Sequence, residues 1–144
     1  MSHIQLTAQG INVISLSKGK SNFGMTCAWA TQVDYDKIIM LIGGQSETGK
    51  ELEINGKVGF SALNNEQIDI AIRFGTSHSL NNDKFGQSME LIDGVPVVKN
   101  ATREIVGKVI SINNYDGDLL VTIQVENMKT NSKPFLTFDK MPKY

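Results

Sequence analysis

The sequence predicts a mainly β protein: a closed or partly closed antiparallel barrel with two or three short helices over its openings. Three observations favour this class. About seven to nine short β-rich runs are separated by turn residues. Two of the longest runs, 105–113 and 119–126, flank Asp116-Gly117, a dipeptide typical of tight hairpins. Helical spacing of apolar residues is confined to short segments, so the regular strand–helix alternation of a doubly wound sheet is not expected.

The composition limits the classes of function. The chain has 144 residues, enough for a single domain spanning 1–144 with a sizeable core. Its net charge is −1 with acids and bases interspersed, which argues against a broad surface for nucleic acid or an anionic membrane. Cys27 is the only cysteine, so no intrachain disulfide can form. The N-terminus lacks signal-peptide features, and no apolar run approaches the roughly 20 residues of a membrane-spanning helix. We therefore expect a soluble cytoplasmic protein.

The expected strands follow the apolar and β-branched runs in chain order. They are 4–7, 11–16, 23–33, 38–42, 57–63, 94–98, 105–113, 119–126 and 135–138, whereas 85–92 fits no single pattern. Residues 38–42 are apolar at every position, so this strand is expected to be buried on both faces. The loop 17–21 carries Lys18 and Lys20, which either are solvated or lie near a bound anion.

The strand expected at 23–33 alternates strictly between two kinds of side chain. One face carries bulkier residues, and the other carries small or polar ones, namely Gly24, Thr26, Ala28, Ala30 and Gln32. A bare face lets a flat ligand lie close to the backbone N–H and C=O groups. The commoner explanation for such a face is a tightly packed helix. Both interpretations stay open at this point.

Two helix starts are expected. Thr48 and Glu51 form a T-x-x-E capping box for a short helix that ends near Gly56. Free N–H groups, the hydroxyls of Ser46 and Thr48, and Lys50 make this start either a candidate anion site or an ordinary capped helix. Asn64 and Gln67 form a second capping box for a helix over 64–73, which Gly75 is placed to end. Residues 76–83 are expected to form a polar loop.

Several kinds of chemistry are disfavoured by the motifs. Residues 44–50 fit G-x-x-x-x-G-K, but Glu51 stands where a P-loop needs a magnesium-binding hydroxyl. The two histidines, at 3 and 78, have no carboxylate or thiol at ligand spacing, so no metal site is expected. Cys27 lies mid-strand without a nearby histidine, and Trp29 is expected in the core. A cofactor that carries its own chemistry, such as a flavin, is consistent with this pattern.

One stretch resembles a known family. Residues 22–33, NFGMTCAWATQV, resemble the N-x-M-T-x-(S/A)-W-x-T-P-V signature of the flavin reductase-like family, the FMN-binding split barrels. Weaker matches follow in order: Ser46-Glu47-Thr48 with the hydroxyl-rich phosphate segment, 59–63 with G-x-F-x-V-N, Asp83-Lys84-Phe85 with D-K-F, and 107–109 with G-x-V. The resemblance covers roughly residues 10 to 125.

The resemblance implies a six-stranded split barrel, usually a homodimer, with FMN at or near the subunit interface. NAD(P)H and flavin would be its small-molecule partners, and flavin would carry the chemistry without a catalytic side chain. The ring would lie along the main chain of 26–31, and the ribityl chain and phosphate would be held at the next helix. The implied or expected FMN-binding residues are Asn22, Met25, Thr26, Cys27, Ala28, Trp29, Ala30, Thr31, Ser46, Thr48, Ser61 and Lys84, to which we add Lys50 for its charge and position.

The sequence also departs from the family pattern. Gln32 replaces the usual proline, and Ser61 stands where Asn is common. The histidine that many reductases carry before G-x-V is missing, because Glu104-Ile105-Val106 precedes Gly107. The leading hypothesis is hydride transfer from NAD(P)H to flavin and on to an acceptor. The alternatives are an FMN-binding electron carrier or flavin store without nicotinamide activity, and a barrel that has lost the cofactor.

Overall fold

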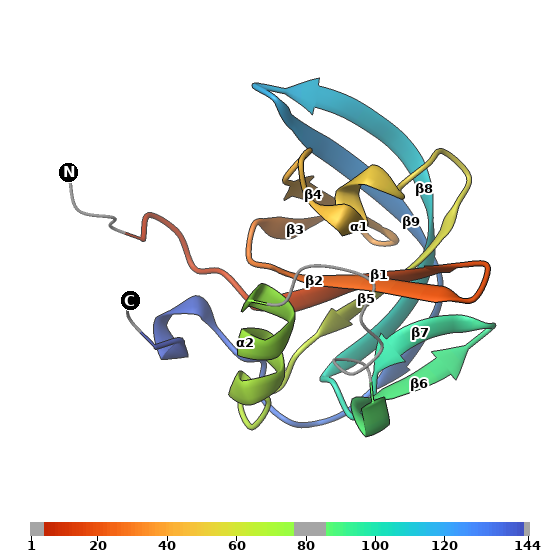
Figure 1. Cartoon of the computed structure of the whole chain (residues 1–144). Coiled ribbons are helices and arrows are strands. Elements are labelled where there is room, and N and C mark those ends of the chain that lie inside the picture. Colours follow the sequence, from red (N-terminus) through yellow and green to blue (C-terminus); the bar gives the residue numbers. More distant parts are fainter. Residues whose placement is uncertain (1–4, 77–85, 143–144) are drawn as a thin grey trace.

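A computed structural model describes residues 5–76 and 86–142. Seven strands form one antiparallel sheet in the order β2-β1-β5-β8-β9-β4-β3, which curls into a barrel (Figure 1). Two further strands, β6 and β7, form a separate hairpin. The strands are β1 Asn12–Lys18, β2 Ser21–Cys27, β3 Ala30–Asp34, β4 Lys37–Ile42, β5 Lys57–Ala62, β6 Met89–Ile92, β7 Val95–Val98, β8 Arg103–Tyr115 and β9 Asp118–Thr130. The expected antiparallel barrel class is confirmed.

The barrel is split where the chain passes from β2 to β3. These two strands are the opposite edges of the sheet, yet only Ala28 and Trp29 separate them in sequence. The single strand expected over 23–33 is therefore wrong. The chain leaves one edge, turns at these two residues and joins the other edge, where the main-chain oxygen of Trp29 accepts a hydrogen bond of 2.9 Å from the N–H of Leu41.

The barrel interior is filled by alternate residues of its strands. In β2, Phe23 and Cys27 point into the main core and are buried. Removing such an apolar side chain from water contributes about 1.5–3 kcal/mol each. In β4, Ile38, Met40 and Ile42 are buried while the residues between them are half-buried. The prediction that this strand is buried on both faces is wrong, because the barrel interior covers only one of them.

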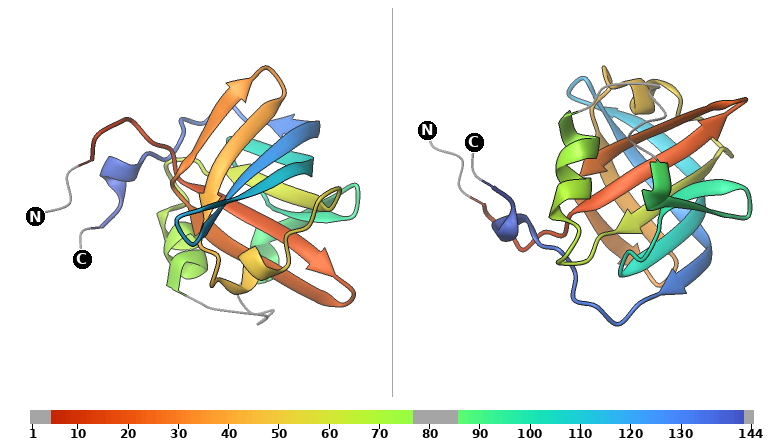
Figure 2. Two further views of the ribbon diagram at one scale, coloured as in Figure 1. Left: turned by 90° about the horizontal axis from the view of Figure 1, so that it is seen from above. Right: turned by 60° about the horizontal axis from the view of Figure 1, so that its bottom comes forward.

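Helix α2, Ile68–Thr76, packs on the outside of the barrel against β1 and β2 (Figure 2). The side-chain oxygen of Gln67 accepts a hydrogen bond of 3.0 Å from the N–H of Asn64, as the expected capping box requires. Asn64 Oδ1 accepts from the N–H of Glu66, at 2.8 Å, rather than from that of Gln67. The helix also continues through Gly75, so the expected stop there is wrong. Residues 77–83 of the expected polar loop lie outside the described residues.

Helix α1, Glu47–Lys50, is a single turn that lies against β1 and β2. Its N-cap is Ser46, whose Oγ accepts a hydrogen bond of 2.9 Å from the N–H of Gly49. Thr48 is inside the turn, so the capping box expected at Thr48 and Glu51 is wrong, as is a helix reaching Gly56. A hydroxyl two residues earlier takes the capping role.

The remaining expectations concern the hairpins and the chain ends. Asp116 and Gly117 both have positive φ, 54° and 89°, and form the expected tight turn between β8 and β9. The strand expected at 135–138 is absent: Phe135 and Thr137 make only isolated bridges, and a 3-10 turn, η3, follows at Phe138–Lys140. Of the strand expected at 4–7, the described residues 5–7 are not β. Within the described ranges, no helix has the length and apolar character needed to cross a bilayer.

Candidate functional site

The stretch that resembles the flavin signature lies at the split of the barrel. β2 and β3 each have one neighbour in the sheet, so each has one edge without a partner strand among the described residues. The break between them separates the two small residues that were expected to share a face. Ala28 packs against the cluster around α2, whereas Ala30 packs against the barrel core. Trp29 is 60% exposed, so the expectation that it lies in the core is wrong.

Part of the bare face of β2 is covered by a helix. Thr26 Oγ1 donates a hydrogen bond of 2.6 Å to the main-chain oxygen of Ala71 in α2. A Cβ added at Gly75, on the same helix, would lie 3.7 Å from the Thr26 side chain, so the helix passes close to this residue. The packed-helix interpretation therefore holds at Thr26, and its hydroxyl is already engaged. Ligand contacts at this residue are left to its backbone.

Cys27 ends β2 in a buried position. Burial raises the pKa of its thiol to about 11, so the thiol is neutral at physiological pH. Its main-chain oxygen accepts a hydrogen bond of 3.1 Å from the buried Asn12 side chain. Asn12 was missed by sequence reasoning, although a polar residue inside the apolar run 11–16 was a signal for it. It fixes the end of β2 directly before the turn at Ala28.

Helix α1 places the expected phosphate residues beside β2. Ser46 Oγ donates to the main-chain oxygen of Gly43 at 2.7 Å besides capping the helix, so its proton is used within the chain. Thr48 is only 3% exposed. Lys50 is exposed but lies at the last residue of α1, not at its N-terminus as expected. Of these side chains, Lys50 is the one that reaches solvent freely.

A groove of about 680 Å³ opens next to β3, and we call it the β3 groove. Ala30 and Thr31 line it, together with core residues including Phe60 and Ile105. Its rim carries the cation of Arg103, which lies 5.1 Å above the ring centre of Phe135. Its size and mostly apolar lining suit a cofactor-sized ligand. Several of its lining residues, Arg103 and Phe135 among them, come from distant parts of the chain and were not predicted.

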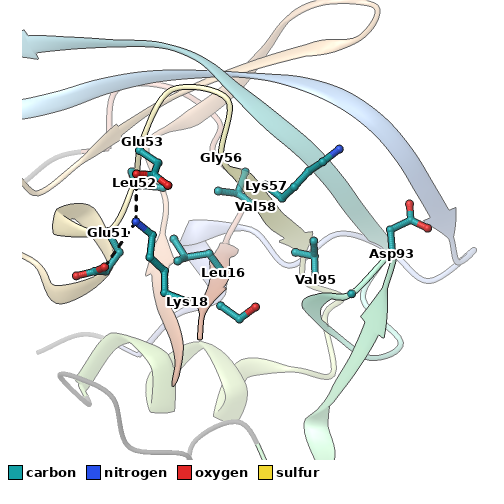
Figure 3. Close-up of a pocket in the computed structure, with 12 residues that line it drawn as sticks. Leu16, Lys18, Glu51, Leu52, Glu53, Gly56, Lys57, Val58, Asp93 and Val95 are labelled. Atoms are coloured by element: carbon teal, nitrogen blue, oxygen red, sulfur yellow. Dashed lines mark ion pairs between the residues drawn. The ribbon is translucent and has the colours of Figure 1, made fainter. Parts of the chain in front are cut away.

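A second cavity, of about 320 Å³, lies away from the predicted residues (Figure 3). Lys18 on its wall pairs with Glu53 at 3.3 Å and with Glu51 at 3.9 Å. Of the two interpretations of Lys18, a place near a bound anion is disfavoured, because two carboxylates already lie beside its ammonium group. The floor of the cavity is apolar and includes Leu16, Val58 and Val95.

Two of the predicted residues that the structure describes lie elsewhere. Asn22 is half-buried in β2, opposite Ser17 of β1. Ser61 is completely buried in β5, where its Oγ accepts a hydrogen bond of 2.8 Å from the N–H of Val98 in β7. It is thus closed to a ligand and serves packing instead. Lys84 lies outside the described residues. No cluster of three or more His, Cys, Asp or Glu side chains that could hold a metal occurs in the described part of the chain.

Comparisons with solved structures agree with this architecture. An NADH:FAD oxidoreductase, SgcE6, from Streptomyces globisporus superposes with a TM-score of 0.84 at 17% identity, covering 94% of this chain and 84% of that one. The flavin reductase PheA2 has a TM-score of 0.80 at 20% identity, covering 92% and 86%. SgcE6 in complex with NAD and FAD fragments is also similar, with a TM-score of 0.82 at 18% identity, covering 92% and 81%. These likenesses show the fold.

No curated protein matches the sequence. The sequence model of one family, described as flavin reductase like domain, matches residues 3–142. Because that match spans nearly the whole chain, the protein belongs to the flavin reductase like domain family.

Proposed function

We propose that this protein binds FMN and transfers hydride from NAD(P)H to flavin, and from there to an acceptor. One observation carries the proposal: the two edge strands of the described sheet meet at Ala28 and Trp29, beside the β3 groove and next to small side chains. Unpaired main-chain donors and acceptors match the polar edge of an isoalloxazine ring. Bound flavin supplies the hydride chemistry, so the protein's part is to bind and orient it.

The ring site is formed by the main chain of Thr26 to Thr31, flanked by Met25. Cys27 and Asn12 hold the end of β2, while Ala28 and Ala30 keep the approach free of large side chains. The groove beside Ala30 and Thr31 offers the adjoining volume. Since the thiol of Cys27 is neutral and buried, it takes no part as a nucleophile.

The flavin tail lies beside α1. Lys50 is exposed there and supplies positive charge, while Ser46 and Thr48 shape the turn that carries it. Asn22 lies in β2, the strand that α1 contacts. Ser61 is left out of the site because it is buried beneath β7. Lys84 is retained on the family resemblance alone.

The protein acts as a homodimer in this proposal. Trp29, Val33 and Tyr35, around β3, are 60%, 52% and 99% exposed, an unusual amount of apolar surface beside one groove. The two end segments of the described chain lie side by side at one end of the molecule (Figure 2), joined by a 2.8 Å hydrogen bond from the N–H of Phe138 to the main-chain oxygen of Gln9. A second copy would cover this surface. Sedimentation equilibrium with Tyr35→Asp beside the wild type tests it: a dimer that the substitution weakens supports the proposal, and a monomeric wild type opposes it.

Stopped-flow mixing tests the enzymatic role. The FMN-loaded protein is mixed anaerobically with NADH and, separately, with NADPH, and flavin absorbance is followed. We expect bleaching with at least one of the two. Loss of absorbance with neither nucleotide, in protein that does hold FMN, removes the reductase activity and leaves flavin binding intact.

One observation favours a second candidate, an FMN-binding electron carrier without nicotinamide activity. The family histidine before G-x-V is missing, and Glu104 within this segment is only 2% exposed, so it offers no replacement group at the surface. This candidate predicts tightly bound FMN that a protein donor reduces and nicotinamides do not. The same stopped-flow experiment therefore separates the two candidates.

A further inference from the structure

The β6–β7 hairpin lies as a second layer on the outer face of β1 and β5, with its end over β8 (Figure 1). Two side-chain hydrogen bonds join the layers: Ser15 Oγ donates to the main-chain oxygen of Pro96 at 2.5 Å, and the N–H of Val98 donates to Ser61 Oγ at 2.8 Å. Gly59 makes the close approach possible, because a Cβ there would stand 2.7 Å from Ser15 Oγ and clash with Pro96. The hairpin is thus attached at a few defined points.

One attachment point is a pair of carboxyl groups. Glu104 of β8 is 2% exposed. Its neighbour on β9 is Lys129, which forms an ion pair of 3.3 Å with Glu90 of β6, so both carboxyl groups lie beside one ammonium group. Glu104 Oε1 has no hydrogen-bond partner, and no other buried side-chain oxygen or nitrogen in the described residues shares that condition. Two ionised carboxylates can only accept, so neither can satisfy the other. One proton between them gives the pair a donor and removes the repulsion.

The surroundings decide which group keeps the proton. Burial, followed by the contact with Glu90, raises the pKa of Glu104 to about 7. The hydrogen bond from Glu104, and then the Lys129 ammonium of β9 at 3.3 Å, lower the pKa of Glu90, with a smaller contribution from Lys99. The neighbour of Glu104 on β5 is the uncharged Ser61, and its neighbour on β9 is Lys129. The Lys129 charge and the Asn100 N–H both lower the pKa of Glu104, but by less than burial and Glu90 raise it. Glu104 therefore carries the proton and Glu90 the charge.

We propose that Glu104 and Glu90 form a proton-operated latch, which holds the β6–β7 hairpin on the barrel in mildly acidic solution and loosens as the pH approaches neutrality. This device is independent of flavin binding and of the proposed activity. It uses a buried acid that no step of that activity needs.

The direction follows from proton linkage. The closed hairpin binds a proton on Glu104 up to a pH of about 7, whereas an opened, hydrated Glu104 releases it near the ordinary value of 4.5. Between these limits the closed state holds one more proton, so its stability falls as pH rises. The opening equilibrium should increase about tenfold per pH unit from about 5 to about 7 and level off above that. The lowered pKa of Glu90 changes the stability of the closed hairpin only below a pH of about 4.5, where that carboxyl begins to bind a proton in the open state.

Hydrogen exchange of peptides covering 89–98 tests the latch. Exchange rates are corrected for the intrinsic effect of pH and measured from pH 5 to 8 in the wild type, in Glu104→Gln and in Glu66→Gln. The side-chain amide that Glu104→Gln introduces donates to Glu90 at every pH, so the slope between pH 5 and 7 should disappear. Glu66, an exposed partner of Lys133, receives the same chemical change and should leave the slope as in the wild type. A flat wild-type profile, or an equal slope in Glu104→Gln, overturns the proposal.

A second measurement needs no variant. Carbon-13 NMR of glutamate carboxyls in the wild type follows the titration of Glu104 directly. A midpoint near 7 supports the latch. A midpoint at the ordinary value for glutamate overturns it, even where Glu104→Gln fails to fold.

Discussion

Thr26 in β2 and Ala71 in α2 are joined by a 2.6 Å hydrogen bond from the threonine hydroxyl to the alanine main-chain oxygen. The bond ties the only long described helix to one edge of the split. It also shows that the Thr26 side chain serves the scaffold, while its backbone remains the part that a ligand can use.

Substituting Thr26→Val should therefore affect stability more than flavin binding. Valine keeps the shape but leaves Ala71 without this donor, at a cost of about 1 kcal/mol in the free energy of unfolding. Urea denaturation measures that change, and a flavin titration should show nearly wild-type affinity. Thr31→Val, at an exposed position of β3, is the control and should change stability by no more than about 0.5 kcal/mol. A large loss of flavin affinity in Thr26→Val would place the side chain in the site.

Ala28→Leu tests the ring position. A leucine at the turn between β2 and β3 would fill the space that the flat ring needs, so FMN affinity should fall at least about tenfold, equivalent to about 1.4 kcal/mol. Fluorescence quenching of FMN gives the dissociation constant, with circular dichroism as the check on folding. Val33→Leu, an exposed site farther along β3, should bind as the wild type does. Equal affinities in both variants would move the ring away from Ala28.

Lys50→Glu tests the phosphate position. Thr48 is buried, so a charge placed there would unfold the turn, whereas Lys50 is exposed and can be reversed without a packing defect. FMN affinity should fall about tenfold at low salt and less at high salt, because exposed charges are screened. Riboflavin, which has no phosphate, should bind as before. Lys140→Glu in η3 is the control. A uniform loss for both flavins would show that the phosphate is not near Lys50.

Gly59→Ala tests the seating of the hairpin. Its Cβ would meet Pro96 and Ser15, so the β6–β7 hairpin must shift, and overpacking of this kind costs about 1–3 kcal/mol. Gly10→Ala meets only ordinary contacts at 3.8 Å and should be nearly neutral. Thermal denaturation of the two variants compares them directly. Equal melting temperatures would mean that the hairpin is not closely seated.

The thiol of Cys27 should be unreactive in the folded protein. Burial raises its pKa from 9.0 to about 11, so the thiolate fraction at pH 8 falls about a hundredfold. Labelling with Ellman's reagent should be slow in buffer and fast in denaturant. Because the folded protein keeps the thiol protonated up to a higher pH than the unfolded chain does, the free energy of unfolding falls only as the pH rises from about 9 toward 11. Rapid labelling of native protein at pH 8 would show that the end of β2 opens readily.

Local patterns were sufficient for much of the fold. The Asp116-Gly117 turn and the shared core face of Val58, Phe60 and Ala62 in β5 depend on neighbouring residues, and both were predicted correctly. Of the capping box before α2, the Gln67 half is confirmed, but the helix begins at Ile68 and not at Asn64. The break at Ala28-Trp29 was not predicted, because the alternation of side chains continues through it. The chain leaves β2 at this point because β3 pairs with β4, at the other edge of the sheet. That pairing is set by the arrangement of the whole sheet and not by nearby residues.

The candidate site was predictable only in part. Family resemblance indicated the strand, and its two halves do lie at the edges of the sheet. Arg103 and Phe135 reach the β3 groove from distant segments, so no pattern near the signature predicted their place in the groove. Ser61 shows the opposite error: it occupies a motif position, but its hydroxyl accepts a bond from another layer. Whether a hydroxyl is free to bind a ligand depends on contacts between the layers of the fold. The spacing of residues along the chain does not predict those contacts.

The link between β2 and β3 is two residues long, and this limits how far apart the two edge strands can lie at the split of the barrel. A longer link would let the edge strands β2 and β3 move apart, while the pairing of each strand with its neighbour keeps its register. Insertions between Ala28 and Trp29 thus offer a simple way to accommodate larger ligands without changing the rest of the sheet.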